Sequence, residues 1–141
     1  MPSRYDDNPD IAIGIKLPLT NGQRGWFEQS YTTLDAAKSN LKNLLLTMKG
    51  ERMMQPNFGT DLMMMIFEQD DGTLADKLRA TIIDAVEYWL PYLRLDKVNV
   101  ENGLAGDDNN VNRFNISLTF SLLNDPKRLD SLTFTLDTTN I

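Results

Sequence analysis

The sequence contains neither cysteine nor histidine among its 141 residues. The absence of cysteine excludes disulfide bonds, thiolate nucleophiles and thiolate zinc sites together. The absence of histidine removes the side chain that most often serves as a general base or a transition-metal ligand near neutral pH. Catalytic systems built on Ser-His-Asp or Cys-His are therefore impossible. We expect no metal and no other cofactor.

The sequence also lacks an excess of positive charge and any long apolar run. Its 14 Lys and Arg against 20 Asp and Glu give a formal net charge of −6. Affinity for a phosphate backbone comes largely from counterions released by Lys and Arg, so we expect no nucleic-acid partner. No apolar run approaches the roughly 20 residues of a transmembrane helix, and residues 1–10 lack the order of a signal peptide. We expect no membrane partner, and a protein that is soluble and cytosolic where it is made.

The length corresponds to one ordinary domain. A chain of this size buries roughly 68–70% of its unfolded surface, so it needs no metal or disulfide to fold. Residues 1–10 contain two prolines and three aspartates. We therefore predict a flexible N-terminal arm over residues 1–10 and a single domain over residues 11–141.

Apolar residues at helical spacing predict three helices. The first follows the N-cap Thr32 and extends to about residue 48. A short second helix is expected over residues 62–67. The third covers about residues 74–90 and is ended by Pro91, because the residue before a proline disfavours helix.

Alternation with period two predicts strands in the rest of the chain. The alternation at 11–17 and 26–27 indicates an N-terminal hairpin. The runs at 98–100, 114–122 and 131–136 indicate a C-terminal three-stranded meander. The predicted fold class is α+β, with three helices packed on a small antiparallel C-terminal sheet and an N-terminal hairpin or arm.

A glycosidase is the obvious enzymatic hypothesis, because two carboxylates suffice for that chemistry. With 20 Asp and Glu in the chain, some pair always falls at a suggestive spacing, and one of the two also needs a cleft that raises its pKa. Solvated charges are the better interpretation. The glutamates concerned are Glu28, Glu51, Glu68, Glu87 and Glu101.

Three consecutive methionines in the second helix point in nearly all directions around its axis. We expect the side chains that pack in the core to be those of Leu62, Met65 and Ile66, because a helix needs only one apolar stripe to pack against the rest of the domain. Met63 or Met64 is left as a possible contact with another protein, for which the flexible methionine side chain is well suited.

One segment is more specific than the fold alone requires. It begins KGERMMQPNFGTDL at residue 49 and closes with Phe-Glu at residues 67–68. These positions resemble the signature of the small baseplate wedge subunit family of contractile-tailed phages, which is related to a type VI secretion baseplate protein formerly labelled lysozyme-like. The signature residues are Lys49, Gly50, Arg52, Pro56, Phe58, Gly59, Leu62, Phe67 and Glu68. The resemblance extends from about Thr32 to Thr135.

The resemblance implies a structural, non-enzymatic subunit of the virion tail baseplate. Its implied partners are other baseplate wedge proteins and the tail sheath protein, within a hexameric assembly; a monomer in isolation is compatible with this. The alternatives are a tail-associated peptidoglycan glycosidase and, more remotely, a free acidic adaptor domain.

One departure from the family concerns the end of the third helix. In a family member this end is Glu-Pro-Arg, which clamps the helical core of the wedge, whereas here it is Leu90-Pro91-Tyr92. A charge-assisted clamp would become an apolar and aromatic one. We expect the wedge-core contact at Leu90, Pro91 and Tyr92, together with Met63 and Met64.

The family's subunit initiates the sheath by offering its sheet to sheath strands. Residues 131–136 suit that role because they contain no Lys, Glu or Pro, which usually block an edge strand. The strand over residues 114–122 is the alternative partner for a sheath strand. In a competing arrangement, the N-terminal hairpin covers the edge formed by residues 131–136. The expected pairing residues are Ser131, Leu132, Thr133, Phe134, Thr135 and Leu136, with the apolar three packing on the helices behind.

Overall fold

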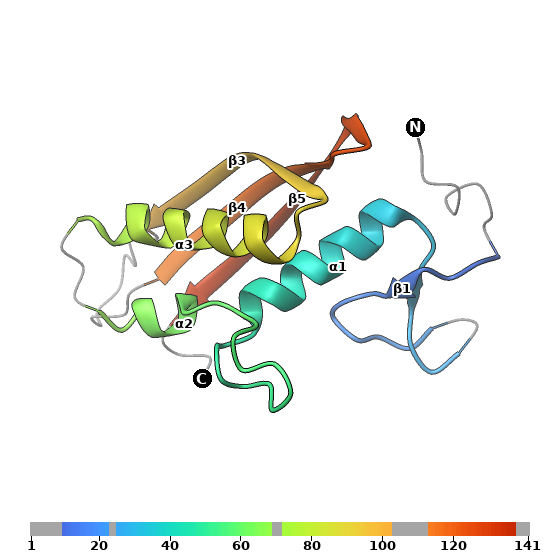
Figure 1. Ribbon diagram of the computed structural model, residues 1–141, viewed down its shortest axis with the longest axis horizontal. Helices are drawn as coiled ribbons and strands as arrows, with labels where there is room; N and C mark the ends of the chain where they lie inside the picture. The colour runs from blue at the N-terminus through green and yellow to red at the C-terminus, as the bar shows by residue number, and fades with distance from the viewer. Residues whose placement is uncertain (1–9, 23–24, 69–71, 103–112, 138–141) are drawn as a thin grey trace.

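The computed structural model describes residues 10–22, 25–68, 72–102 and 113–137. It confirms the α+β class, with three helices, a two-stranded N-terminal sheet and a three-stranded C-terminal sheet (Figure 1). The arm expected over residues 1–10 lies outside the described residues except for its last residue, and the single domain over 11–141 stays a prediction.

The helices follow the capping and stop signals of the sequence. In α1 (Thr33–Leu46) the Thr32 side chain accepts a hydrogen bond of 3.2 Å from the backbone N–H of Asp35, as an N-cap does. The second helix, α2 (Leu62–Met65), is two residues shorter than expected. The third, α3 (Leu74–Trp89), ends just before the Leu90-Pro91 bond.

The C-terminal sheet is an antiparallel meander of β3 (Leu93–Asn102), β4 (Arg113–Leu122) and β5 (Asp125–Asp137), in that order. The meander is confirmed, but β3 and β5 are longer than their apolar alternation indicated. Charged residues in β3 and at the start of β5 weaken the sequence signal there, whereas pairing with β4 keeps both segments extended.

The core lies between the helices and one face of this sheet. Helix α3 packs against β3 and α1 packs against β5. Along β4 the apolar side chains are buried and the intervening polar ones are mostly exposed. Each fully buried large apolar side chain contributes about 1.5–3 kcal/mol. From β4 these are Phe114, Ile116, Leu118 and Phe120.

The N-terminal hairpin pairs β1 (Gly14–Ile15) with β2 (Gln29–Ser30). The hairpin itself is confirmed, but the prediction that residues 26–27 form its returning strand is wrong. Trp26 and Phe27 are exposed in the connecting segment, because the pairing register places Gly14 opposite Ser30 and Ile15 opposite Gln29. Among the described residues, no helix is long and apolar enough to cross a membrane.

Candidate docking surfaces

The signature segment forms a tight connector between α1 and α2. The Gly50 N–H donates a 2.7 Å hydrogen bond to the Pro56 carbonyl, which closes the loop at its base. Gly50 has φ +87°, a value that favours glycine. The Lys49 ammonium forms an ion pair of 2.7 Å with Asp61, just before α2. These contacts fix where the loop begins and ends.

A second set of contacts attaches the connector to the end of α1. The Thr60 hydroxyl is buried and donates to the Leu45 carbonyl at 2.9 Å, and its N–H donates to the Thr47 carbonyl at 2.9 Å. Gly59 has φ +114°, and a Cβ there would lie 2.4 Å from the Thr47 carbonyl oxygen. Only glycine allows this close approach of two backbone segments.

Aromatic packing joins the connector to α3. The Arg52 guanidinium lies 3.9 Å from the centroid of the Phe58 ring, a cation–π contact. The Phe58 ring in turn meets Trp89 edge-on at 5.1 Å. The side chain of Leu62 is fully buried in the core, whereas that of Phe67, near the end of the signature, is exposed.

The connector presents methionines at the surface. Met53 and Met54 are 97% and 94% exposed at its tip. In α2, Met63 and Met65 are partly buried against the core, while Met64 is mostly exposed. Of the two methionines that the sequence left open, Met64 is therefore the one most available to a partner.

The residues at the end of α3 differ in burial: one lies in the core and two lie at the surface. Leu90 is only 8% exposed and belongs to the chain's own core, so it has little surface left for a partner. Pro91 and Tyr92 are exposed. The Tyr92 hydroxyl accepts a 3.0 Å hydrogen bond from the Asn40 side chain of α1, which fixes the direction of the ring.

The C-terminal sheet has one central strand and two edges. Because β4 pairs with β3 on one side and β5 on the other, the alternative that residues 114–122 receive a sheath strand is wrong. The outer edge of β5 pairs with no other strand in the part of the chain that the structure describes, and the N-terminal hairpin forms a separate sheet.

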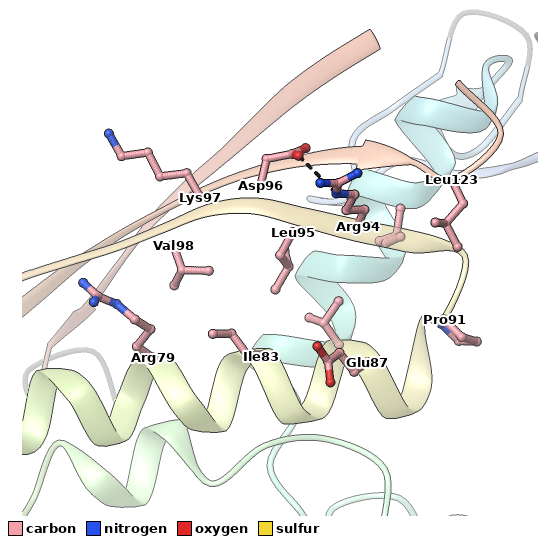
Figure 2. A pocket seen from close by; sticks show the side chains of 12 residues that line it. Arg79, Ile83, Glu87, Pro91, Arg94, Leu95, Asp96, Lys97, Val98 and Leu123 are labelled. Carbon is pink, nitrogen blue, oxygen red and sulfur yellow. Dashed lines mark ion pairs between the residues drawn. The ribbon is translucent and has the colours of Figure 1, made fainter. Parts of the chain in front are cut away.

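The opposite edge, β3, borders an open groove that α3 also lines. Figure 2 shows Arg79, Ile83 and Glu87 of α3 facing Leu95 and Val98 of β3 across this groove. On the same strand, Asp96 contacts Arg94 at 3.5 Å and accepts a 2.8 Å hydrogen bond from the Ser121 hydroxyl. The pairing of β3 with β4 is irregular between Leu95 and Lys97.

The carboxylates that a glycosidase would need do not lie in a buried cleft. No Asp or Glu is buried within residues 10–22, 25–68, 72–102 and 113–136. The hydrogen bond from Lys16, and a second from Thr20, lower the pKa of Glu28, whereas a general acid requires the opposite shift. The described residues also contain no cluster of three or more possible metal ligands.

One surface was missed from the sequence. The alternation of residues 11–17 predicts a strand but does not say which face is covered, and Ile11, Ile13 and Ile15 are all exposed. The signal that could have indicated this is Gly14, which alternates with the isoleucines and marks the side that closely approaches other backbone.

Comparisons with known proteins agree on one family. The family model described as baseplate wedge protein gp25 matches residues 33–127. A protein with that same description from Enterobacteria phage T4 is 29% identical over 107 residues, covering 76% of this chain and 77% of that protein.

Two solved structures share the fold. A Geobacter sulfurreducens protein described as a tail lysozyme has a TM-score of 0.64 at 19% identity, covering 74% of this chain and 90% of that one. A chain of the anti-feeding prophage baseplate has a TM-score of 0.57 at 17% identity, covering 90% of this chain and 85% of that one.

Proposed function

Because this chain belongs to the baseplate wedge protein gp25 family and is thus a component of a contractile-tail baseplate, we propose that its role there is purely structural. In this proposal it docks on neighbouring wedge proteins and starts the sheath, whose first strands pair with the outer edge of β5. The observation that carries the proposal is the contrast between the two edges of the C-terminal sheet.

The β5 edge is the better template for a further strand. Residues 131–136 contain no charged residue and no proline, and their outer edge is unpaired among the described residues. The beginning of the strand differs, because Pro126, Lys127 and Arg128 oppose pairing there. Pairing is therefore expected to start at about Ser131.

The β3 edge is protected. Four of its ten residues are charged, and its register is irregular beside Asp96, a feature that turns an edge away from partners. The adjoining groove with α3 also places Arg79 and Glu87 beside this edge (Figure 2). An incoming strand would have to displace or desolvate these charges, which β5 does not require.

The β5 edge is held rigid from behind. Leu132 and Leu136 are buried in the core, and Phe134 packs against it from a half-buried position. The alternate residues Ser131, Thr133 and Thr135 are exposed. A strand that is already rigid loses little conformational entropy when a further strand pairs with it. Its main-chain hydrogen bonds therefore contribute more to the affinity.

The wedge contact is proposed at the exposed end of α3. Pro91 and the ring of Tyr92 supply an apolar and aromatic surface, and the hydrogen bond from Asn40 keeps that ring in place. Met64 is exposed on α2 and remains part of the proposal, while Leu90 and Met63 contribute mainly through the core.

A non-enzymatic role is supported by the chemistry of the carboxylates, none of which is buried within residues 10–22, 25–68, 72–102 and 113–136. The competing function, a peptidoglycan glycosidase on the tail, requires one carboxyl whose pKa is raised by burial. A clearing assay with purified protein on peptidoglycan separates the two: we expect no lysis, and carboxylate-dependent lysis would overturn the structural proposal.

Sheath initiation is tested by Thr133→Pro, which removes one backbone donor from β5. We expect helical circular dichroism to persist and sheath to fail to nucleate on assembled baseplates. Thr133→Lys is a second variant that keeps the bonds to β4 but places an edge-blocking charge on the strand. Thr133→Val is the matched control, because it retains the N–H, and should nucleate sheath normally. Normal sheath on both the proline and the lysine variant would refute pairing through β5.

A further inference from the structure

The N-terminal hairpin, residues 10–22 and 25–31, packs on α1 through small and polar groups. A Cβ at Gly14 would lie 3.1 Å from the Ser30 hydroxyl and 3.7 Å from Cβ of Ala36 on α1, so this side of β1 is filled. Ser30 is fully buried, and the Leu17 N–H donates to the Ser39 hydroxyl of α1 at 3.3 Å. The inner face at Gly14 therefore has no room for a large apolar side chain.

The large apolar side chains of the hairpin point the other way. Successive residues of a strand face opposite sides, so Ile13 and Ile15 lie opposite Gly14, and their side chains are 36% and 51% exposed. Ile11, which precedes the strand, is also exposed. Of the described residues before Thr32, none belongs to the hydrophobic core or packs against it. The hairpin thus has its polar side inside and its apolar side outside, the reverse of an ordinary half-buried strand.

An exposed tryptophan and local neutrality complete this surface. Trp26 is 90% exposed and Phe27 lies beside it in the sequence, also exposed. Between residues 11–22 and 25–31 the charged side chains are Lys16 and Glu28, which form an ion pair of 3.0 Å with each other. Asp10 and Arg24 flank these two ranges in the sequence. Neutral patches with aromatic anchors are typical of the centres of protein interfaces, and monomeric proteins seldom leave such patches uncovered.

The chain's own N-terminus is a poor cover for this patch. Residues 1–9 are MPSRYDDNP, with one methionine and one tyrosine among prolines, polar and charged residues. The composition of this segment offers little apolar surface to set against three isoleucines and a tryptophan. The patch requires a larger apolar surface from another molecule.

The hairpin that carries this patch lies near the proposed wedge contact. Ser39 of α1 binds the hairpin through Leu17, and the next residue, Asn40, binds the Tyr92 hydroxyl. Figure 1 shows β1 beside the N-terminal half of α1, away from the three-stranded sheet. A partner that covers Pro91 and Tyr92 can therefore extend along α1 to the hairpin.

The likeness to a baseplate component also extends into this region. The anti-feeding prophage chain covers 90% of this protein, more than residues 33–141 can supply, whereas the Geobacter sulfurreducens protein covers 74%. The structural similarity to a chain seen within a baseplate thus includes residues before α1, outside the segment that the family model matches.

We propose that the N-terminal hairpin is a second docking element, which binds an uncharged aliphatic surface of a neighbouring baseplate wedge protein. Ile11, Ile13 and Ile15 lie flat on this surface and Trp26 inserts into a cleft between aliphatic side chains of the partner. The inference extends the proposed wedge contact at Pro91 and Tyr92, and does not depend on sheath pairing by β5.

The photocross-linking residue p-benzoylphenylalanine in place of Trp26, in baseplates assembled with the full chain, tests the identity of the occupant. We expect an adduct with a different baseplate protein. Adducts only with a second copy of this chain, or only with its own residues 1–9, would overturn the proposal, as would the absence of any adduct. The same residue in place of Tyr92 tests the wedge contact separately, so an adduct there without one at position 26 would refute the hairpin alone.

A variant pair measures how much the isoleucines contribute. Ile13→Ser with Ile15→Ser should lower incorporation into baseplates about tenfold or more, because central apolar contacts dominate interface affinity. Ile13→Val with Ile15→Val, the matched control, keeps an aliphatic face and should remain within about twofold of the unmodified chain. The thermal midpoint of each purified variant verifies that the fold is retained. Unchanged incorporation of the folded serine pair would refute the docking role.

Discussion

Gly59 offers the sharpest test of how the connector between α1 and α2 is built. Replacing it with alanine places a Cβ 2.4 Å from the Thr47 carbonyl oxygen and 3.0 Å from the carbonyl carbon. Both atoms are backbone, so no side chain can rotate away. The new residue would also retain φ +114°, which L-residues rarely adopt.

The cost follows from two effects. A non-glycine residue in a sparsely populated backbone region costs about 1–3 kcal/mol. Relief of the clash separates the Thr47 carbonyl from the Thr60 N–H, a 2.9 Å hydrogen bond beside a buried hydroxyl, and loss of such a buried bond costs about 1–3 kcal/mol. We therefore expect Gly59→Ala to lower the free energy of unfolding by about 2–6 kcal/mol, a large part of the roughly 5–15 kcal/mol typical of domains.

Gly50→Ala is the matched control. Gly50 also has positive φ, +87°, but a Cβ there meets no atom within 4 Å, so only the backbone term remains, about 1–2 kcal/mol. Urea unfolding followed by far-ultraviolet circular dichroism measures both changes. If the two variants differ by less than about 1 kcal/mol, the close approach of the connector to Thr47 does not constrain the fold.

Three further predictions concern the cap of α1, the hairpin and the connector tip. Thr32→Ala should destabilise the protein by about 1 kcal/mol through loss of the N-cap bond, measured by urea unfolding, and Thr32→Ser should restore most of it. The pKa of Glu28 is lowered by its hydrogen bond from Lys16, so its contribution is present above the ordinary carboxyl pKa and is lost as the pH falls through the lowered value. The pKa of Lys16 is raised, so its contribution is lost only as the pH rises through that raised value; protection of the β1–β2 amides from hydrogen exchange should fall at both extremes, and Glu28→Gln should remove the acidic change. Met53→Ser with Met54→Ser should leave the thermal midpoint within about 2 °C, because both side chains are almost fully exposed; a larger decrease would show that the tip packs on the fold.

Much of the fold was predictable because its signals are local. The spacing of apolar residues in α1 and α3, the Thr32 cap and Pro91 act over one or two helical turns, and the alternation in β4 needs only one buried face. The added length of β3 and β5 was not predictable, since it depends on hydrogen bonds to β4 rather than on their own side chains.

The candidate docking surfaces were also predictable only in part. The sequence by itself determined the family signature, the absence of Cys- and His-based chemistry, and an uncharged strand at residues 131–136. It could not determine that the N-terminal hairpin forms a separate sheet, that Leu90 is buried while Tyr92 is exposed, or that the hairpin isoleucines face outward. Those outcomes were decided by the tertiary structure, because an apolar side chain looks the same in the sequence whether its own chain covers it or leaves it to a partner.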